Sequence, residues 1–437
     1  ASLKTLDSRF LSDLHSIDYF ENNSSQPYQN QVYIRKEADG QFYYENVLHS
    51  GDIIVTPDKF RFDKITSADG AVTYSLLDYV GFESEITLPV TINECPYGYS
   101  YYIGRLAKKV IVPEGITDIC NLFVAEDGRS YGQKVEEVIL PDSVTVIPAN
   151  AFYNTNLTKI TLGSQITEIG NRAFRGSNIK SITLPKTVTK IGMEAFYDCR
   201  SLESVKIPAT VTSIAINAFG NCPSLHELTI SPENAAYVFE NGALYNKDKT
   251  QLLWVSFDVT DLVIPETVSE MGDVFAEHSA LQTVRFADNS PVTILTESMF
   301  QGCTSLTMVR LPDGLTQIGA KAFKDCTALS GVTDLAGLKS VGDEAFKNCT
   351  SLKDFYFPET LNNIGTGAFW GSSLTQIDLT ACHSLSYIRD QAFADCTSLA
   401  KVFLPDDMFS LRSEAFSGCK SLSEIRLPKN LQSIGWS

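Results

Sequence analysis

The chain has 437 residues, which is too long for one ordinary hydrophobic core and indicates either several globular domains or an array of repeats. Hydrophobic residues make up 43% of it and charged residues 20%, proportions that exclude an intrinsically disordered protein. The formal net charge of −17 argues against a nucleic-acid partner and against a basic membrane-binding patch, because both depend on Lys and Arg. No apolar run approaches the roughly 18 residues of a membrane-spanning helix, so we expect no transmembrane segment.

Residues 1–74 are predicted to form a small α+β region that precedes a repeat array. Apolar residues at helical spacing from Leu6 to Ile17 predict a helix. Apolar segments next to Asp39-Gly40 and to Asp69-Gly70 predict two β-hairpins. This region is expected to be either a cap over the open end of the array or a separate small binding module.

A short segment after Phe123 contains a catalytic motif without its context. Gly128 to Gly132 match the G-x-S-x-G nucleophile elbow, which needs a strand before it, a helix after it, and an acid and a histidine later in the chain. The preceding residues are typical of a polar turn, and no α/β-hydrolase pattern follows. We therefore expect no catalysis at Ser130.

The dipeptide Ala-Phe recurs along the rest of the chain. Eleven phenylalanines align, nine of them after Ala, and the gaps between them are 22 to 25 residues except for one gap of 56. Chance does not produce such a series, and a fixed period of this length is the signature of a repeat architecture. The aligned residues are Phe152, Phe174, Phe196, Phe219, Phe275, Phe300, Phe323, Phe346, Phe369, Phe393 and Phe416.

Each unit is predicted to form one coil of a solenoid. In one unit Leu202, Val205 and Ile207 predict a short strand, and the proline that follows ends it. The Ala-Phe segment is expected to form a single helical turn on the opposite face. Because helical turns are bulkier than strands, the stacked units should curve with a parallel, concave sheet. Glycines after the second apolar segment are expected where a positive φ is needed, at Gly170, Gly192, Gly319 and Gly365.

Residues Leu184 to Leu202 read Leu-Pro-x-x-Val-Thr-x-Ile-Gly-x-x-Ala-Phe-x-x-Cys-x-Ser-Leu, and this unit resembles the BspA-like, or Treponema-type, leucine-rich repeats. Weaker units begin near Ile86 and Val110, so the resemblance covers roughly residues 75–437. It implies an α/β fold, a leucine-rich-repeat solenoid of about 23-residue units. It also implies a surface protein, because the family is known mainly from surface proteins of host-associated bacteria, with some in parasitic protists, and its members are implicated in adhesion.

The gap of 56 residues between Phe219 and Phe275 predicts a β-hairpin insert at about residues 232–258. Asn241-Gly242 and the polar segment 246–250 lie between apolar alternations and are turn signals. The insert is expected to be either a structural excursion from the edge of the solenoid or a docking loop.

The cysteines predict packing rather than chemistry. Seven of the ten stand three residues after a repeat phenylalanine, a slot that Thr155, Ser177, Ser372 and His278 fill in other units. Such a slot favours a small buried residue, so we expect free thiols. Since neither Cys nor His has metal-ligand spacing, and no P-loop, GxGxxG or HExxH is present, we expect no metal, no cofactor and no enzyme activity. The seven are Cys199, Cys222, Cys303, Cys326, Cys349, Cys396 and Cys419.

Alternating strand side chains should face outward on the concave sheet, where a ligand could bind. Arg285 and Arg310 should be adjacent, about 5 Å apart at the usual strand spacing. Exposed aromatics with arginines are enriched at interface hot spots, although aromatics can also simply cover a sheet. The candidate binding residues are Arg285, Met308, Arg310, Tyr356, Phe403 and Arg426.

The sequence therefore predicts a non-enzymatic recognition or adhesion protein that binds a protein or glycan of a host or a neighbouring cell. The alternatives are a carbohydrate- or peptide-active enzyme with chemistry outside the repeats, and a self-assembling surface structural protein. The family resemblance implies an extracellular or cell-surface location, as the mature part of an exported protein whose precursor could carry a lipid anchor. The oligomeric state is left open.

Overall fold

The computed structural model describes residues 19–22, 31–38, 41–47, 52–55, 60–66, 72–79, 83–90, 97–99, 107–120, 122–123 and 134–436. Two compact units make up the chain, Ala1–Thr187 (unit 1) and Val188–Ser437 (unit 2). The described residues form strands, turns and loops but no helix. The helix predicted between Leu6 and Ile17 lies outside the described residues, so an α+β cap is not confirmed, and the predicted domain boundary at residue 74 remains a prediction.

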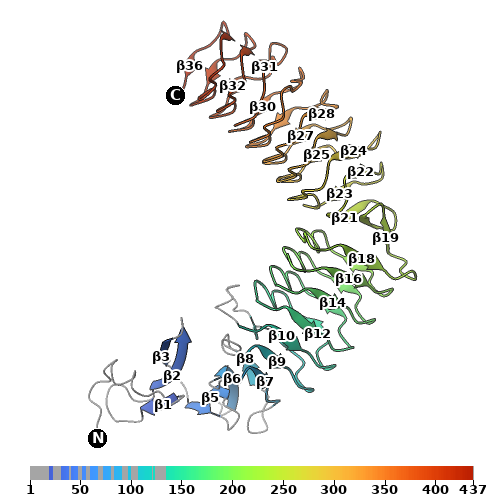
Figure 1. Ribbon diagram of the computed structural model, residues 1–437, viewed down its shortest axis with the longest axis vertical. Helices are drawn as coiled ribbons and strands as arrows, with labels where there is room; N and C mark the ends of the chain where they lie inside the picture. The colour runs from blue at the N-terminus through green and yellow to red at the C-terminus, as the bar shows by residue number, and fades with distance from the viewer. Residues whose placement is uncertain are drawn as a thin grey trace. The chain divides into compact units, whose positions relative to one another are not determined.

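The N-terminal strands form two small sheets, shown in blue in Figure 1. Strand β2 pairs with β3 from Ala38↔Gln41 outward, and β5 pairs with β6 from Thr66↔Val72 outward, which confirms both predicted hairpins. The strands are β1 (Tyr19–Asn22), β2 (Gln31–Ala38), β3 (Gln41–Val47), β4 (Asp52–Val55), β5 (Phe60–Thr66), β6 (Val72–Tyr79) and β8 (Tyr97–Tyr99).

The repeats form stacked coils with two rows of strands. Each coil places its Leu-x-x-Val-x-Ile segment in a first row and a two-residue strand in a second row. The first row contains, in unit 1, β7 (Glu85–Thr87), β9 (Lys109–Ile111), β10 (Glu137–Ile139), β12 (Lys159–Thr161) and β14 (Ser181–Thr183). In unit 2 it contains β16 (Ser204–Ile207), β18 (Glu227–Ile230), β22 (Asp261–Ile264), β24 (Thr283–Phe286), β26 (Met308–Arg310), β28 (Gly331–Thr333), β31 (Gln376–Asp378), β33 (Lys401–Phe403) and β35 (Glu424–Arg426).

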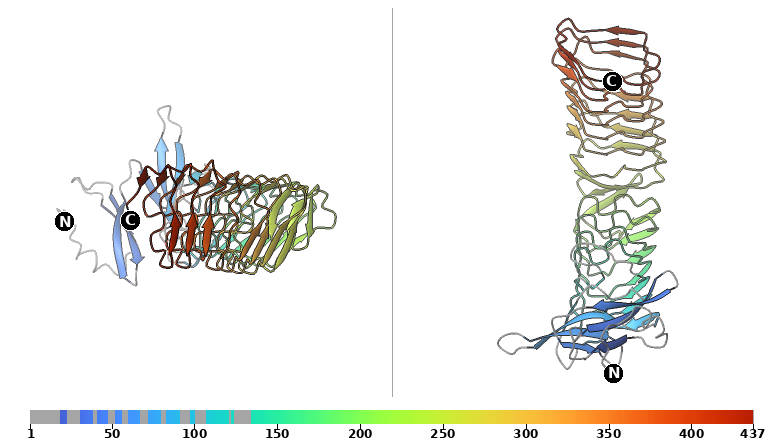
Figure 2. Two further views of the ribbon diagram at one scale, coloured as in Figure 1. Left: turned by 90° about the horizontal axis from the view of Figure 1, so that it is seen from above. Right: turned by 90° about the vertical axis from the view of Figure 1, so that its left-hand side faces the viewer.

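Neighbouring strands in each row are parallel. This confirms the prediction for the first row, whereas the second row of strands was not predicted. The right-hand view of Figure 2 shows the strands of unit 2 running across the stack, one coil above another. The second row contains, in unit 1, β11 (Val146–Ile147) and β13 (Glu168–Ile169). In unit 2 it contains β15 (Lys190–Ile191), β17 (Ser213–Ile214), β23 (Glu270–Met271), β25 (Ile294–Leu295), β27 (Gln317–Ile318), β29 (Ser340–Val341), β30 (Asn363–Ile364), β32 (Tyr387–Ile388), β34 (Ser410–Leu411) and β36 (Ser433–Ile434).

The prediction of a concave first-row sheet is wrong for unit 2. In Figure 1, strands β22, β24, β28 and β31 lie along the outer side of the curve that unit 2 makes, and β23, β25, β27, β30 and β32 lie along its inner side. The prediction assumed a bulky helical turn opposite the first row. No such turn exists in the described coils, so the assumed cause of the curvature is absent. We therefore call the first row of unit 2 the outer row and the second row the inner row.

The Ala-Phe segment is a flat turn that bonds to the next coil. Lys321 and Asp325, on either side of Ala322 and Phe323, have φ of 56° and 61°. The amides of Lys321, Phe323 and Asp325 donate to carbonyls of the next coil over 2.7–2.8 Å. A helix would direct these amides along its own axis instead. The sequence signal for the turn is the Asn, Asp or Gly two residues after every repeat phenylalanine except Phe275, which Glu277 follows, since Asn, Asp and Gly tolerate left-handed backbone best.

The repeat phenylalanines from Phe275 to Phe416 form a continuous stack, as their role of core anchor requires. Phe323 is fully buried between Phe300 and Phe346, with ring centroids 5.2 and 5.1 Å away and nearly parallel planes. Stacked coils thereby share one core, which no single coil could close by itself.

The glycines after the inner-row strands serve close packing rather than a positive φ. None of Gly170, Gly192, Gly319 and Gly365 has a positive φ. A Cβ on Gly365 would lie 2.5 Å from the backbone nitrogen of Asp343 in the preceding coil, and a Cβ on Gly319 would lie 2.7 Å from the Leu295 carbonyl oxygen. The predicted reason for these glycines is therefore wrong, and the correct one is contact between backbones.

The cysteines that stand three residues after repeat phenylalanines, here called the cysteine ladder, form a row of buried hydrogen bonds. The Cys326 thiol donates to the carbonyl oxygen of Phe300 in the preceding coil over 3.0 Å, and Cys349 repeats this bond to Phe323 over 3.1 Å. Burial raises the pKa of the Cys303 thiol to about 12. The slot thus needs a small hydrogen-bond donor, which explains why Ser and Thr share it. The thiols of Cys222, Cys303, Cys326, Cys349, Cys396 and Cys419 are free, as predicted.

The insert is part of the solenoid wall. Its strands are β19 (Tyr237–Glu240), β20 (Ala243–Asn246) and β21 (Gln251–Val255), and the two predicted hairpin turns are confirmed. Strand β21 pairs in parallel with β23, so it continues the inner row. Leu252, Trp254 and Val255 are buried. An excursion from the edge would not bury these side chains, so that interpretation is corrected.

His278 adapts the ladder to this insert. It stands in the cysteine slot, is fully buried, and its Nε2 donates to the carbonyl oxygen of Ser256 over 2.6 Å. The imidazole stacks on Phe257, with ring centroids 4.6 Å apart. Burial lowers the pKa of His278 below its ordinary value, because the charged form loses its hydration.

This histidine should make stability depend on pH. Because its pKa is lower in the folded state, the unfolded chain takes up a proton that the folded chain does not, and stability falls as the pH drops below about 6.5. The loss approaches at most about 1.4 kcal/mol per pH unit. We expect His278→Cys, which restores the residue of the other coils, to flatten the dependence of Tm on pH between about 7.5 and 5.5. Calorimetry at several pH values measures this slope, and equal slopes for both proteins would rule out the effect.

Candidate functional site

The outer row brings three of the six predicted binding residues together. Arg285 pairs in register with Arg310 across β24 and β26, which confirms that they are neighbours. Met308 lies two residues before Arg310 on the same face of β26, and Val309 between them is buried. Met308 is 41% exposed, so an apolar side chain and two guanidinium groups share one patch.

Aspartates hold the arginines of this patch. Arg310 Nη1 lies 2.8 Å from Asp288 Oδ1 and its Nε 3.0 Å from Asp334 Oδ2. The hydrogen bonds to Asp334 and Asp288 raise the pKa of Arg310 above its ordinary value. Arg285 approaches the same Asp288 at 4.0 Å. The patch is therefore rigid but not basic, since its positive charges are neutralised locally.

Tyr356 lies in a coil whose outer segment is not a strand. Residues 354–357 have no strand assignment, so the outer sheet stops at β28 and resumes at β31. Phe355 fills an inward position that Val, Ile or Leu holds in the other coils, and it packs edge-on against Phe346 and Phe369 at 5.1 Å each. We attribute the lost pairing to this larger ring. Tyr356 is 64% exposed beside the break.

Phe403 and Arg426 form a second group further along the outer row. They pair in register across β33 and β35, with Phe403 half-buried and Arg426 exposed. Arg426 lies 3.7 Å from Asp406, which also pairs with Lys429 at 2.6 Å. Four coil steps separate Arg310 from Phe403, about 19 Å at the usual strand spacing, so the structure does not bring the six residues into one pocket.

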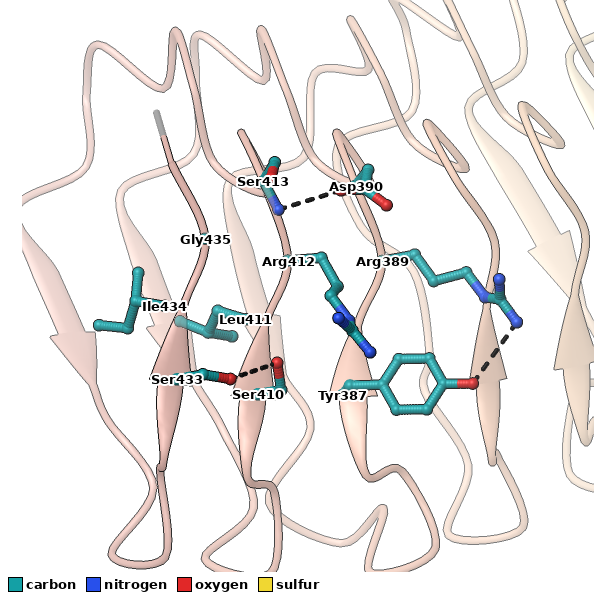
Figure 3. A pocket seen from close by; sticks show the side chains of 10 residues that line it. All are labelled: Tyr387, Arg389, Asp390, Ser410, Leu411, Arg412, Ser413, Ser433, Ile434 and Gly435. Carbon is teal, nitrogen blue, oxygen red and sulfur yellow. Dashed lines mark hydrogen bonds between the residues drawn. The ribbon is translucent and has the colours of Figure 1, made fainter.

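The inner row carries a depression that the sequence analysis missed. It has a volume of about 390 Å³ and is lined by residues of β32, β34 and β36 and of the turns that follow them. Figure 3 shows Arg389 and Arg412 on either side of the Tyr387 ring, with the hydroxyls of Ser410 and Ser433 beside them. The guanidinium carbons lie 5.5 and 5.8 Å from the ring centroid, within range of a cation–π interaction.

The signal for this site is a departure from the repeat. Arg389 follows Ile388, and Arg412 follows Leu411, in the place that Gly365 holds after Ile364. Glycine holds this place in most coils, and outside the insert the other coils without it have the smaller residues Pro148, Ala215 and Thr296. Two consecutive coils thus carry a long cation where close packing favours glycine.

The arginines of the depression have no carboxylate partner among the described residues. Arg389 Nε donates to Asn363 Oδ1 over 3.2 Å, and its Nη2 approaches the Tyr387 hydroxyl at 3.4 Å. The lining carboxylate, Asp390, accepts instead from the Ser413 amide over 3.1 Å. Most guanidinium donors therefore remain available, in contrast to those of Arg310 on the outer row.

The described residues contain no group of three or more His, Cys, Asp or Glu side chains placed to hold a metal ion. Among the same residues, no helix is long and apolar enough to cross a membrane. The G-x-S-x-G segment around Ser130 lies outside them.

Comparisons with known proteins agree with this architecture. A family model described as "BspA type Leucine rich repeat region", in six copies, matches residues 129–250, 256–335 and 332–437. A leucine-rich repeat protein from Eubacterium ventriosum is 25% identical, with a TM-score of 0.56 over 88% of this chain and 94% of that one. Two others are a leucine rich cell surface protein from Faecalibacterium prausnitzii (23% identical, TM-score 0.46, 86% and 95% covered) and the pneumococcal vaccine antigen PcpA (20%, 0.48, 88% and 88%). No curated protein matches the chain significantly.

Proposed function

Because the chain belongs to the BspA-type leucine-rich repeat family, we propose that it is a non-enzymatic recognition protein of the cell surface that binds a protein partner through its outer row. The sequence resemblance supports a surface location, since it implies the mature part of an exported protein. The predicted binding residues keep their place in this proposal, but on the outer rather than the concave face.

One observation carries the proposal, namely apolar side chains exposed on an uncovered parallel sheet. Parallel sheets are normally covered on both faces, and their outward residues are then buried. Here Val263 and Met308 are 60% and 41% exposed on such a sheet, and Tyr356 is 64% exposed where the sheet is interrupted. From Arg285 to Arg426 the row spans six coil steps, about 29 Å, which is the width of a patch of about 800 Å² on one partner of a typical complex.

The charges of the row favour a protein over a polyanion. Asp288, Asp313 and Asp334 surround Arg310, so the patch presents oriented, locally neutral groups between apolar side chains. Such a mixture of aromatic, Met and Arg residues resembles the core of protein interfaces, which bulk charge does not dominate.

The test is a double substitution on the row, Met308→Ala with Tyr356→Ala. The wild-type protein is first applied to an array of purified extracellular-matrix and plasma proteins, and the proteins that bind are then titrated with each variant. We expect about a tenfold or greater loss of affinity, because hot-spot side chains each contribute more than 1 kcal/mol. Ile294→Ala is the matched control, since Ile294 is 48% exposed on the inner row.

A loss of affinity supports the proposal only if the double variant melts at the same temperature as the wild-type protein. Retained binding in a folded double variant, or an equal loss in Ile294→Ala, would show that the outer row is not the binding surface. If the wild-type protein binds no protein on the array, the proposed function is wrong.

A further inference from the structure

The depression on the inner row is a separate site with different chemistry from the outer row. Its guanidinium groups lie in two consecutive coils and converge on one aromatic ring, Tyr387 (Figure 3). Since none of the described carboxylates pairs with Arg389 or Arg412, their charge is directed at solvent. An anion could therefore bind here without displacing an existing partner.

We propose that this depression binds a sugar that carries a carboxylate or sulfate group. Arg412 is exposed and keeps all its guanidinium donors, and Arg389 keeps its Nη1 donors, so the two can grip one multi-oxygen anion. The hydroxyl of Ser433, which donates to Ser410 over 2.8 Å and can still accept, and the ring of Tyr387 also line the depression and suit the hydroxyls and ring of a sugar.

Two features favour a sugar over an acidic peptide. The lining strands β32, β34 and β36 already pair with one another, so their backbone groups cannot form the ladder that an extended peptide needs. The depression is also shallow and mostly polar, without a deep apolar pocket for a peptide side chain.

The negative net charge of the chain means that an anion must be held by a local arrangement of positive groups. At −17 the protein as a whole repels anions. Nonspecific attraction therefore cannot explain binding of an acidic sugar, and any binding must come from a local arrangement. Arg389 and Arg412 provide that arrangement, because both guanidinium groups lie at the Tyr387 ring and neither pairs with a carboxylate among the described residues.

Calorimetric titration of the full chain with four probes tests the site. Trigalacturonate supplies carboxylates, a heparin-derived trisulfated disaccharide supplies sulfates, maltotriose is the neutral sugar, and triglutamate is the acidic peptide. We expect one or both acidic sugars to bind, with an affinity that falls as salt rises, and maltotriose and triglutamate to bind at least about tenfold more weakly.

The variants assign any binding to these residues. Arg412→Gln should weaken acidic-sugar binding about tenfold, and the double variant Arg389→Gln with Arg412→Gln should abolish it. The Arg412 side chain makes no hydrogen bond among the described residues, and the backbone bond from its amide to the Ile388 carbonyl does not depend on that side chain, so the single variant should fold even if the double variant does not. Arg200→Gln is the matched control, because Arg200 is an exposed arginine that does not line the depression, and this variant should bind the acidic sugars normally.

Three results would overturn the site. They are no binding of either acidic sugar, equal binding of triglutamate, or acidic-sugar binding that survives in a folded Arg412→Gln variant. The protein-binding test on the outer row is independent, because Met308 and Tyr356 lie on the other row of strands.

Discussion

Replacing Phe323 by alanine should lower the free energy of unfolding by about 3–5 kcal/mol. Phe323 is fully buried, and its ring stacks between Phe300 and Phe346. Alanine would leave a void in the stack, and the neighbouring coils cannot close it, because hydrogen bonds between Ala-Phe turns fix their spacing. Urea denaturation followed by circular dichroism measures the change.

Phe409→Ala is the control for this substitution. The Phe409 side chain is 42% exposed. The hydrogen bond from the Phe409 backbone amide to the Ser386 carbonyl oxygen does not depend on that side chain. It should change stability by no more than about 0.5 kcal/mol. Comparable losses for both variants would show that removal of any phenylalanine, rather than a gap in the stack, destabilises the protein. Because coils contact mainly their neighbours, new proteolytic cleavage in Phe323→Ala should concentrate near that coil.

The repeat period predicted most of the fold because coil geometry follows from period and pattern. Phe323 and its equivalents are core anchors, Arg285 lies beside Arg310, and the hairpin at Asn241-Gly242 forms. Each of these depends on local turn chemistry or on repeating one unit at a fixed spacing. None of these three features depends on the relative widths of the two sides of a coil, which determine the curvature.

Curvature and turn type could not be predicted in the same way. Both depend on the backbone between Ile318 and Cys326, where Lys321 adopts a left-handed conformation without being a glycine. Propensity gives little warning of this, since the stabilising bonds go to the next coil rather than to residues nearby in sequence. The sequence analysis therefore assigned a helical turn and placed the binding residues on the wrong side of the curve.

The inner-row site was missed for a related reason. Glycine after the inner-row strand was taken as a requirement for φ, and a requirement for φ says nothing about why Arg389 and Arg412 stand there. Once the glycine is understood as a backbone contact, a side chain as long as arginine in its place stands out as a departure from the repeat. Departures from a local rule tend to mark functional sites.

Gly365→Ala tests this interpretation of the glycine slot. A Cβ at Gly365 would lie 2.5 Å from two backbone atoms, the Asp343 nitrogen and the Gly342 carbonyl carbon. One of the two coils must therefore shift, which strains the hydrogen bond from the Gly365 amide to the Val341 carbonyl oxygen. We expect a loss of about 1–3 kcal/mol in urea denaturation. Gly314→Ala, with nothing within 4 Å of its Cβ, should instead stabilise by about 0.4–1 kcal/mol. If Gly365→Ala were equally harmless, the slot would impose no steric demand, and Arg389 would lose its significance as an exception to the repeat.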